Sequence, residues 1–139
     1  MHTVNIPCIS VDDAHHSRFI ETQLSTSDHN GMWITTRQNA LNFRHRVSAP
    51  GYASTWHVAG DPTLIIIRQG ELVIELRDGS SKVFRAGDQF IAADYLPSSI
   101  AFSEQHGHRA FVQSDEALEA IHIKLSDDPM AFRMSLMAT

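Results

Sequence analysis

Short segments of β-branched and aromatic residues, separated by turn residues, recur every 8–12 residues between residues 32 and 125. This spacing is typical of an all-β sandwich or barrel, in which each short strand contributes one row of side chains to the core. In residues 71–76, for example, three apolar side chains alternate with Glu71 and Glu75, as expected for a half-buried strand. The predicted strands are 32–36, 41–47, 63–68, 71–76, 82–85, 89–92, 100–102, 108–112 and 117–125.

The two ends of the chain carry different signals. Residues 1–30 are polar and irregular, and we expect an N-terminal strand region there with a short strand at 17–24. At the other end, Ser126-Asp127-Asp128-Pro129 is typical of a helix start, so we expect a short helix over 127–137 that closes one end of the barrel. No linker or repeat divides the chain, which predicts one domain, 1–139, with a barrel core at about 32–125.

Charge and cysteine content exclude several classes of protein. The 139 residues include 16 acidic and 11 basic ones, giving a net charge of −5, which disfavours nucleic acid or an anionic membrane as the main partner. A lone Cys8 excludes an intramolecular disulfide and a paired-cysteine zinc finger. The beginning of the chain has no secretory signal pattern, and the longest apolar run, 64–67, cannot cross a bilayer. We therefore expect a cytoplasmic protein.

Nine histidines are the unusual feature of the composition. Histidine is the commonest metal ligand and also the side chain that exchanges protons near neutral pH. His106 and His108 are two residues apart, so on a strand their side chains project to the same face. Together with His57 and His122 they could form a metal site, or one or two of them could line a pocket as hydrogen-bonding groups without metal.

Residues 51–70 resemble the first sequence signature of the cupin superfamily. Gly51, His57 and Gly70 keep its spacing, but Ala59 and Thr63 stand where the second histidine and the glutamate would be. The second signature keeps only its first glycine. The resemblance implies a cupin-like β-barrel, a double-stranded jelly roll, whose standard metal-binding motifs are degenerate.

A poorly characterised group of small cupins with a Trp-His pair is more similar still. Its pattern implies that Asp94 and His108 belong to the site, provided that residues 96–105 form an inserted loop. Small cupins of this kind often pair as dimers through an edge strand or an exchanged N-terminal segment. The matching residues are Trp56-His57, Gly70-Glu71, Asp94 and Gly107-His108-Arg109.

The sequence leaves two main functional hypotheses. The first is a small-molecule-binding barrel, a homodimer with no certain cofactor, which binds a small organic acid or sugar derivative because inward-facing arginines suit a carboxylate or phosphate. The alternative is a metal-dependent dioxygenase, isomerase or lyase that holds Fe, Mn, Ni or Zn with His57, His106, His108 and His122. A regulatory or interaction protein is a weaker third hypothesis. The predicted pocket residues are Trp56, His57, Arg44, His108 and His122.

Overall fold

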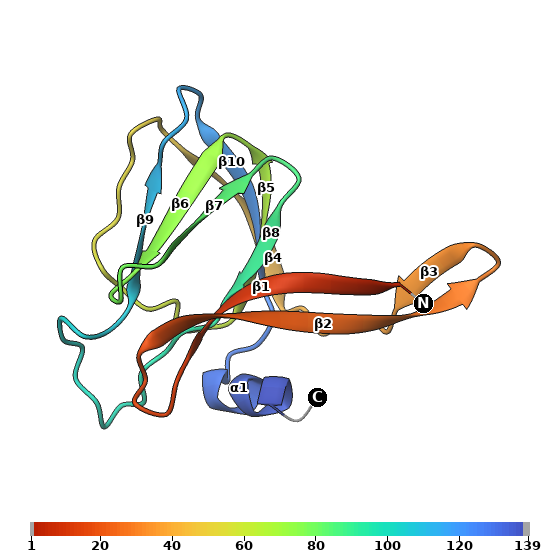
Figure 1. The fold of residues 1–139 in the computed structure, drawn as a ribbon, viewed down its shortest axis with the longest axis horizontal. Helices are drawn as coiled ribbons and strands as arrows, with labels where there is room; N and C mark the ends of the chain where they lie inside the picture. The colour runs from red at the N-terminus through yellow and green to blue at the C-terminus, as the bar shows by residue number, and fades with distance from the viewer. Residues whose placement is uncertain (1, 138–139) are drawn as a thin grey trace.

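Residues 2–137, the part that the computed structural model describes, form two β-sheets and one helix (Figure 1). Residues 1, 138 and 139 of the predicted domain lie outside this part. The elements are β1 (Thr3–Val11), β2 (Ser17–His29), β3 (Met32–Thr35), β4 (Asn42–Ser48), β5 (Thr63–Gln69), β6 (Glu71–Leu76), β7 (Ser81–Arg85), β8 (Gln89–Ala92), β9 (His108–Val112), β10 (Leu118–Lys124) and α1 (Pro129–Met137).

The larger sheet has the strand order β3-β2-β1-β8-β5-β10-β4, and it faces a smaller sheet of order β7-β6-β9. The prediction of an all-β barrel with a short C-terminal helix is therefore confirmed. Within residues 2–137 the strand pairs are antiparallel except for β1 and β8, which pair in parallel. A parallel pair needs a long crossover connection, and the chain between β1 and β8 supplies one.

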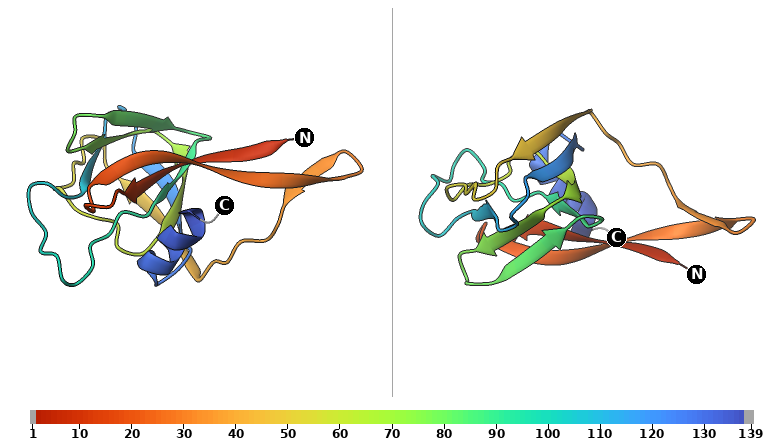
Figure 2. Two further views of the ribbon diagram at one scale, coloured as in Figure 1. Left: turned by 60° about the horizontal axis from the view of Figure 1, so that its bottom comes forward. Right: turned by 90° about the horizontal axis from the view of Figure 1, so that it is seen from above.

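Two apolar clusters follow from the alternation of side chains along the strands. Ile65, Ile67 and Phe90 point between the sheets into the barrel core, where Phe90 stacks on Phe84 with 4.3 Å between ring centroids. Leu64 points to the opposite face, which α1 covers (Figure 2). This explains why residues 63–67 are apolar on both faces. The second cluster contains Ile6, Cys8, Ile91 and Ala93, with Val4, Leu24, Leu64, Leu125, Phe132 and Leu136 packed against it.

The hairpin between β6 and β7 shows how local sequence sets the turns. Gly79 has φ +89°, which favours glycine, and the Asp78 carboxylate accepts a hydrogen bond from the Ser80 backbone N–H at 2.9 Å. The resulting register places Val73 opposite Val83. Asp78-Gly79 thus forms the tight turn of this hairpin, as the pair commonly does.

The N-terminal region is more regular than its sequence suggests. β1 runs for 9 residues and β2 for 13, so β2 continues past residue 24, where we expected it to end. Asn5 and Pro7 have low strand propensity, but pairing with β2 and β8 overrides it. Residues 2–5 and 23–35 extend away from the barrel as an arm (Figures 1 and 2).

The predicted strand at 100–102 is not formed. Residues 93–107 instead make a long connection between β8 and β9, in agreement with the inserted loop expected at 96–105. Within residues 2–137 no helix has the length and apolar character needed to cross a membrane.

Candidate functional site

A cavity of about 230 Å³ lies between the two sheets. Strands of both sheets and the irregular segment before β5 contribute to its walls. Because side chains alternate along each strand, Arg44, Arg46 and Ser48 of β4 face this space, as do Leu118 and His122 of β10. The lining residues are Arg44, Arg46, Ser48, Tyr52, Ser54, His57, Val58, Ala59, Thr63, Ile65, Leu72, Ile74, Phe90, Ala92, His108, Ala110, Leu118 and His122.

Positive charge is concentrated on one wall of the cavity. Arg44 and Arg46 reach it from β4, and the Arg46 guanidinium donates a hydrogen bond to the Tyr52 hydroxyl at 3.0 Å. No aspartate or glutamate is among the lining residues within 2–137, and neither arginine forms an ion pair in that part of the chain. The cavity is therefore electropositive, although the chain as a whole has a net charge of −5.

His122 lies on β10 directly opposite Arg44 of β4. Burial, reinforced by the nearby charges of Arg46 and Arg44, lowers the pKa of His122 from 6.5 to about 4. At pH 7 this imidazole is therefore neutral, so it can both donate and accept a hydrogen bond at the cavity wall.

His57 and His108 stand side by side on the opposite part of the lining. Their rings are 4.5 Å apart between centroids, and their backbones form an isolated β-bridge with two hydrogen bonds of 2.9 and 2.8 Å. His57 Nδ1 donates to the Thr55 carbonyl at 2.8 Å. This leaves His57 Nε2 as the ring nitrogen without a partner inside residues 2–137.

Asp94 is the polar centre beside these histidines. Its carboxylate is fully buried and accepts three hydrogen bonds, from His108 Nδ1 at 2.7 Å, Ser17 Oγ at 2.7 Å and the Ala59 backbone N–H at 2.9 Å. Burial and the charge of Asp94 raise the pKa of the Cys8 thiol to about 12, so Cys8 stays a buried, unreactive thiol.

Of the predicted pocket residues, Arg44, His57, His108 and His122 line the cavity, whereas Trp56 does not. Trp56 lies at a bend in the chain directly before His57, so its side chain does not follow that of His57 into the cavity. Trp56 lies outside, between two guanidinium groups: Arg77 at 4.0 Å and Arg109 at 4.8 Å from the ring centroid. This stacking gives Trp56 a packing role on the outer surface.

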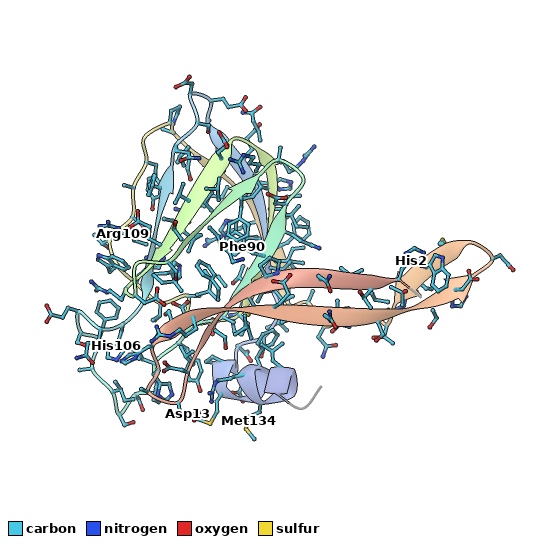
Figure 3. All side chains as sticks on the ribbon, viewed as in Figure 1. His2, Asp13, Phe90, His106, Arg109 and Met134 are labelled. Atoms are coloured by element: carbon cyan, nitrogen blue, oxygen red, sulfur yellow. The ribbon has the colours of Figure 1, made fainter. Side chains whose placement is uncertain are left out.

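His106 also lies away from the cavity. Gly107 has φ +86°, which breaks the extended conformation that would have placed His106 and His108 on one face. His106 instead receives a hydrogen bond at Nδ1 from the Ser103 N–H at 3.1 Å. Figure 3 shows His106 on the loop at the end of the barrel, while Phe90 lies between the sheets.

The four histidines proposed as metal ligands are thus not brought together. No group of three or more His, Cys, Asp or Glu side chains in residues 2–137 is arranged to hold a metal ion. Ala59 and Thr63, which stand at two ligand positions of the cupin signature, line the cavity without a carboxylate or imidazole donor. These side chains do not fit a three- or four-ligand site for Fe, Mn, Ni or Zn.

Arg46 and Asp94 belong to the site but were not among the predicted pocket residues. Arg46 could have been found from strand alternation, since residues 44 and 46 share a face. The hydrogen bond between Asp94 and His108, by contrast, joins residues of two different segments across the loop. No local pattern predicts it.

Comparisons with known proteins concern the fold. No family model and no curated protein matches the chain. A cupin 2 conserved barrel protein from Salinispora arenicola is similar with 21% identity, a TM-score of 0.46 and coverage of 78% of this chain and 90% of its own. A cupin superfamily protein from Desulfitobacterium hafniense has 22% identity, a TM-score of 0.43 and coverage of 68% and 84%. A cupin-2 domain protein from Shewanella frigidimarina has 19% identity and a TM-score of 0.41, and the match covers 60% of this chain and 69% of its own.

Proposed function

We propose that this cupin-like barrel binds a small organic acid in its central cavity, with Arg44 and Arg46 holding the carboxylate. The observation that carries the proposal is the pair of guanidinium groups in a cavity whose described lining contains no acidic side chain. A guanidinium group matches the geometry of a carboxylate and can donate two parallel hydrogen bonds to it. A ligand carboxylate would supply Arg44 and Arg46 with the ion-pair partner that no described side chain gives them.

The cavity size and its other polar groups support a small ligand. A volume of about 230 Å³ is below the ~300–1,000 Å³ of pockets that hold drug-sized molecules. Neutral His122 and the hydroxyl groups of Ser48 and Ser54 offer hydrogen bonds beside the arginines. Leu72, Ile74 and other apolar lining residues favour a short carbon skeleton over a fully hydroxylated sugar.

Calorimetric titration with pyruvate and with its neutral methyl ester tests the proposal. We expect pyruvate to bind and the ester to bind at least about tenfold more weakly, since a charge-assisted hydrogen bond contributes about 1.5–3 kcal/mol. Arg44→Gln should weaken pyruvate binding by a similar factor. Arg68→Gln is the matched control, because Arg68 is exposed on β5 and is not among the lining residues. Equal affinities for acid and ester would contradict the proposal.

We also propose that the protein forms a homodimer through its sheet edges. β4 is the last strand of the larger sheet, and Phe43 and Val47 on it are 68% and 67% exposed. At the other edge Met32 is 61% exposed on the arm. Unpaired edges with apolar side chains favour association with another strand, and a second copy of the chain offers one.

Sedimentation equilibrium tests the dimer. The wild type should sediment as a dimer at micromolar concentration, and Phe43→Lys should shift it towards the monomer. Phe102→Lys is the control, since Phe102 is 48% exposed but lies on the loop between β8 and β9 rather than on a sheet edge. A monomeric wild type would refute this part of the proposal.

The alternative of a metal-dependent enzyme finds no support in the positions of the four histidines. Elemental analysis of protein purified without an affinity tag tests this alternative directly. Near-stoichiometric metal that is lost in His57→Ala or His108→Ala would establish the alternative and overturn the metal-free binding site.

A further inference from the structure

We infer that His108, positioned by Asp94, is a general base that removes a proton from carbon in the bound acid. The inference rests on the proposed function, because the acid must be held in the cavity for the base to reach it. The substrate class is a small 2-oxo acid or a related carbon acid, with an acidic C–H beside a carbonyl group. The protein would then be an enzyme that catalyses proton transfer or isomerisation.

The His108 ring is held in one orientation by Asp94. Its Nδ1 lies 2.7 Å from an oxygen of the buried Asp94 carboxylate, so Nδ1 is the donor in this contact. In the neutral imidazole the proton is therefore on Nδ1, and Nε2 carries the lone pair. Ser17 and Ala59 hold the carboxylate in place from two other segments of the chain. The tautomer is thus fixed by a rigid, buried anion.

The other ring nitrogen of His108, Nε2, is open to the cavity. His108 lines the cavity, and no hydrogen bond joins its Nε2 to another group in residues 2–137. The same part of the chain contains no buried side-chain nitrogen or oxygen that lacks a hydrogen-bond partner. Since Nε2 has no partner, it must reach the solvent of the cavity. A lone pair is therefore available at the place where the ligand would lie.

His108 and the neighbouring His57 differ in the group that accepts the hydrogen bond from Nδ1. His57 is also fixed with Nδ1 as donor, but its partner is the neutral Thr55 carbonyl and its side chain is exposed. A carboxylate partner stabilises the imidazolium that forms when the ring accepts a proton, whereas a carbonyl group does so less. Of the two rings, His108 is therefore the one whose imidazolium form a carboxylate partner would stabilise, and it is 4% exposed.

The chemistry of the proton decides the substrate class. A C–H proton beside a carbonyl group leaves slowly without a catalyst, so a base positioned at the cavity wall would accelerate its removal from a bound 2-oxo acid. In the proposed step the proton moves from carbon to His108 Nε2, and the electron pair of the C–H bond moves onto the carbonyl oxygen as an enolate. The imidazolium then returns a proton to carbon, and no oxidant or other reactant is consumed.

Exchange of the methyl protons of pyruvate in D₂O, followed by ¹H NMR in the presence of EDTA, tests the inference. The wild type should accelerate exchange over buffer alone. His108→Asn should lower the rate by about 100-fold or more, the usual contribution of general base catalysis. Asparagine keeps a donor to Asp94 near the Nδ1 position but has no group at Nε2, and calorimetry verifies that the variant still binds pyruvate.

Two further variants separate catalysis from structure. His45→Asn makes the matched change at an exposed histidine of β4 that is not among the lining residues, and it should keep exchange within about threefold of wild type. Asp94→Asn should lower exchange while keeping the His108 ring, because the amide N–H places the imidazole proton on Nε2. Activity that falls in His45→Asn and persists in His108→Asn would overturn the assignment.

The remaining outcomes distinguish this inference from the proposed function. If pyruvate binds but its protons exchange no faster than in buffer, the base is refuted and the binding function stands. Exchange that EDTA abolishes would assign the reaction to a metal and refute His108 as the base. If neither pyruvate nor 2-oxoglutarate binds, the proposed function fails and the inference fails with it.

Discussion

Replacing Asp94 with asparagine changes one atom in a fully buried network, so its effects can be worked out bond by bond. The Ala59 backbone N–H donates to Oδ1 at 2.9 Å and cannot reverse its role. The amide oxygen of the introduced asparagine must therefore take the Oδ1 position, and its amide nitrogen takes the Oδ2 position. The new N–H groups then face Ser17 Oγ and His108 Nδ1, which are donors in the wild type.

Both of these partners can reverse. The Ser17 hydroxyl can rotate to accept, and His108 can move its proton from Nδ1 to Nε2. Hydrogen bonds to charged groups contribute about 1.5–3 kcal/mol and neutral ones about 0.5–1.5 kcal/mol, so each of the three bonds loses roughly 1 kcal/mol. We expect the free energy of unfolding to fall by about 2–3 kcal/mol without loss of the fold.

Urea unfolding followed by circular dichroism measures the stability, and ¹⁵N NMR of the imidazoles identifies the tautomer. Asp115→Asn is the matched control, because Asp115 is exposed and should change stability by less than about 0.5 kcal/mol. The reasoning is refuted if Asp94→Asn is as stable as this control. It is equally refuted if His108 of the variant still carries its proton on Nδ1.

Two other predictions concern a glycine and a histidine. Gly107→Ala should unfold at clearly lower urea concentration than Gly79→Ala: both glycines have positive φ, but a Cβ at Gly107 would meet the His57 carbonyl oxygen at 2.6 Å, whereas nothing lies within 4 Å at Gly79. Equal losses of stability in the two variants would contradict the close approach of the His57 backbone to Gly107. His122 should titrate near pH 4 in an NMR pH series. Because its folded pKa is lowered from 6.5, the unfolded state binds more protons between these values, and stability falls as pH drops from about 6.5 to about 4. Arg46→Gln should raise this pKa partway, and a His122 that titrates at its ordinary value would contradict the buried position.

Much of the fold could be predicted because its signals are local. The alternation in β6 is a property of neighbouring residues and is present as predicted, and the Asp-Gly turn before β7 is set by local sequence in the same way. β1 is the exception among the strands, because its pairing partners β2 and β8 override its weak propensity. The predicted strand at 100–102 failed for the opposite reason, since an apolar segment without a pairing partner stays a loop.

The sequence by itself determined that the chain is an all-β protein, and its resemblance to the cupin signature implied that Ala59 and Thr63 stand where two metal ligands would be. The tertiary structure decided which polar groups meet. Asp94 contacts His108 and Ser17 across separate segments, and the positive φ of Gly107 sends His106 away from the cavity. Spacing along the chain sets the face on which a side chain lies, whereas long-range packing sets its neighbours. The candidate base is therefore a property of the fold.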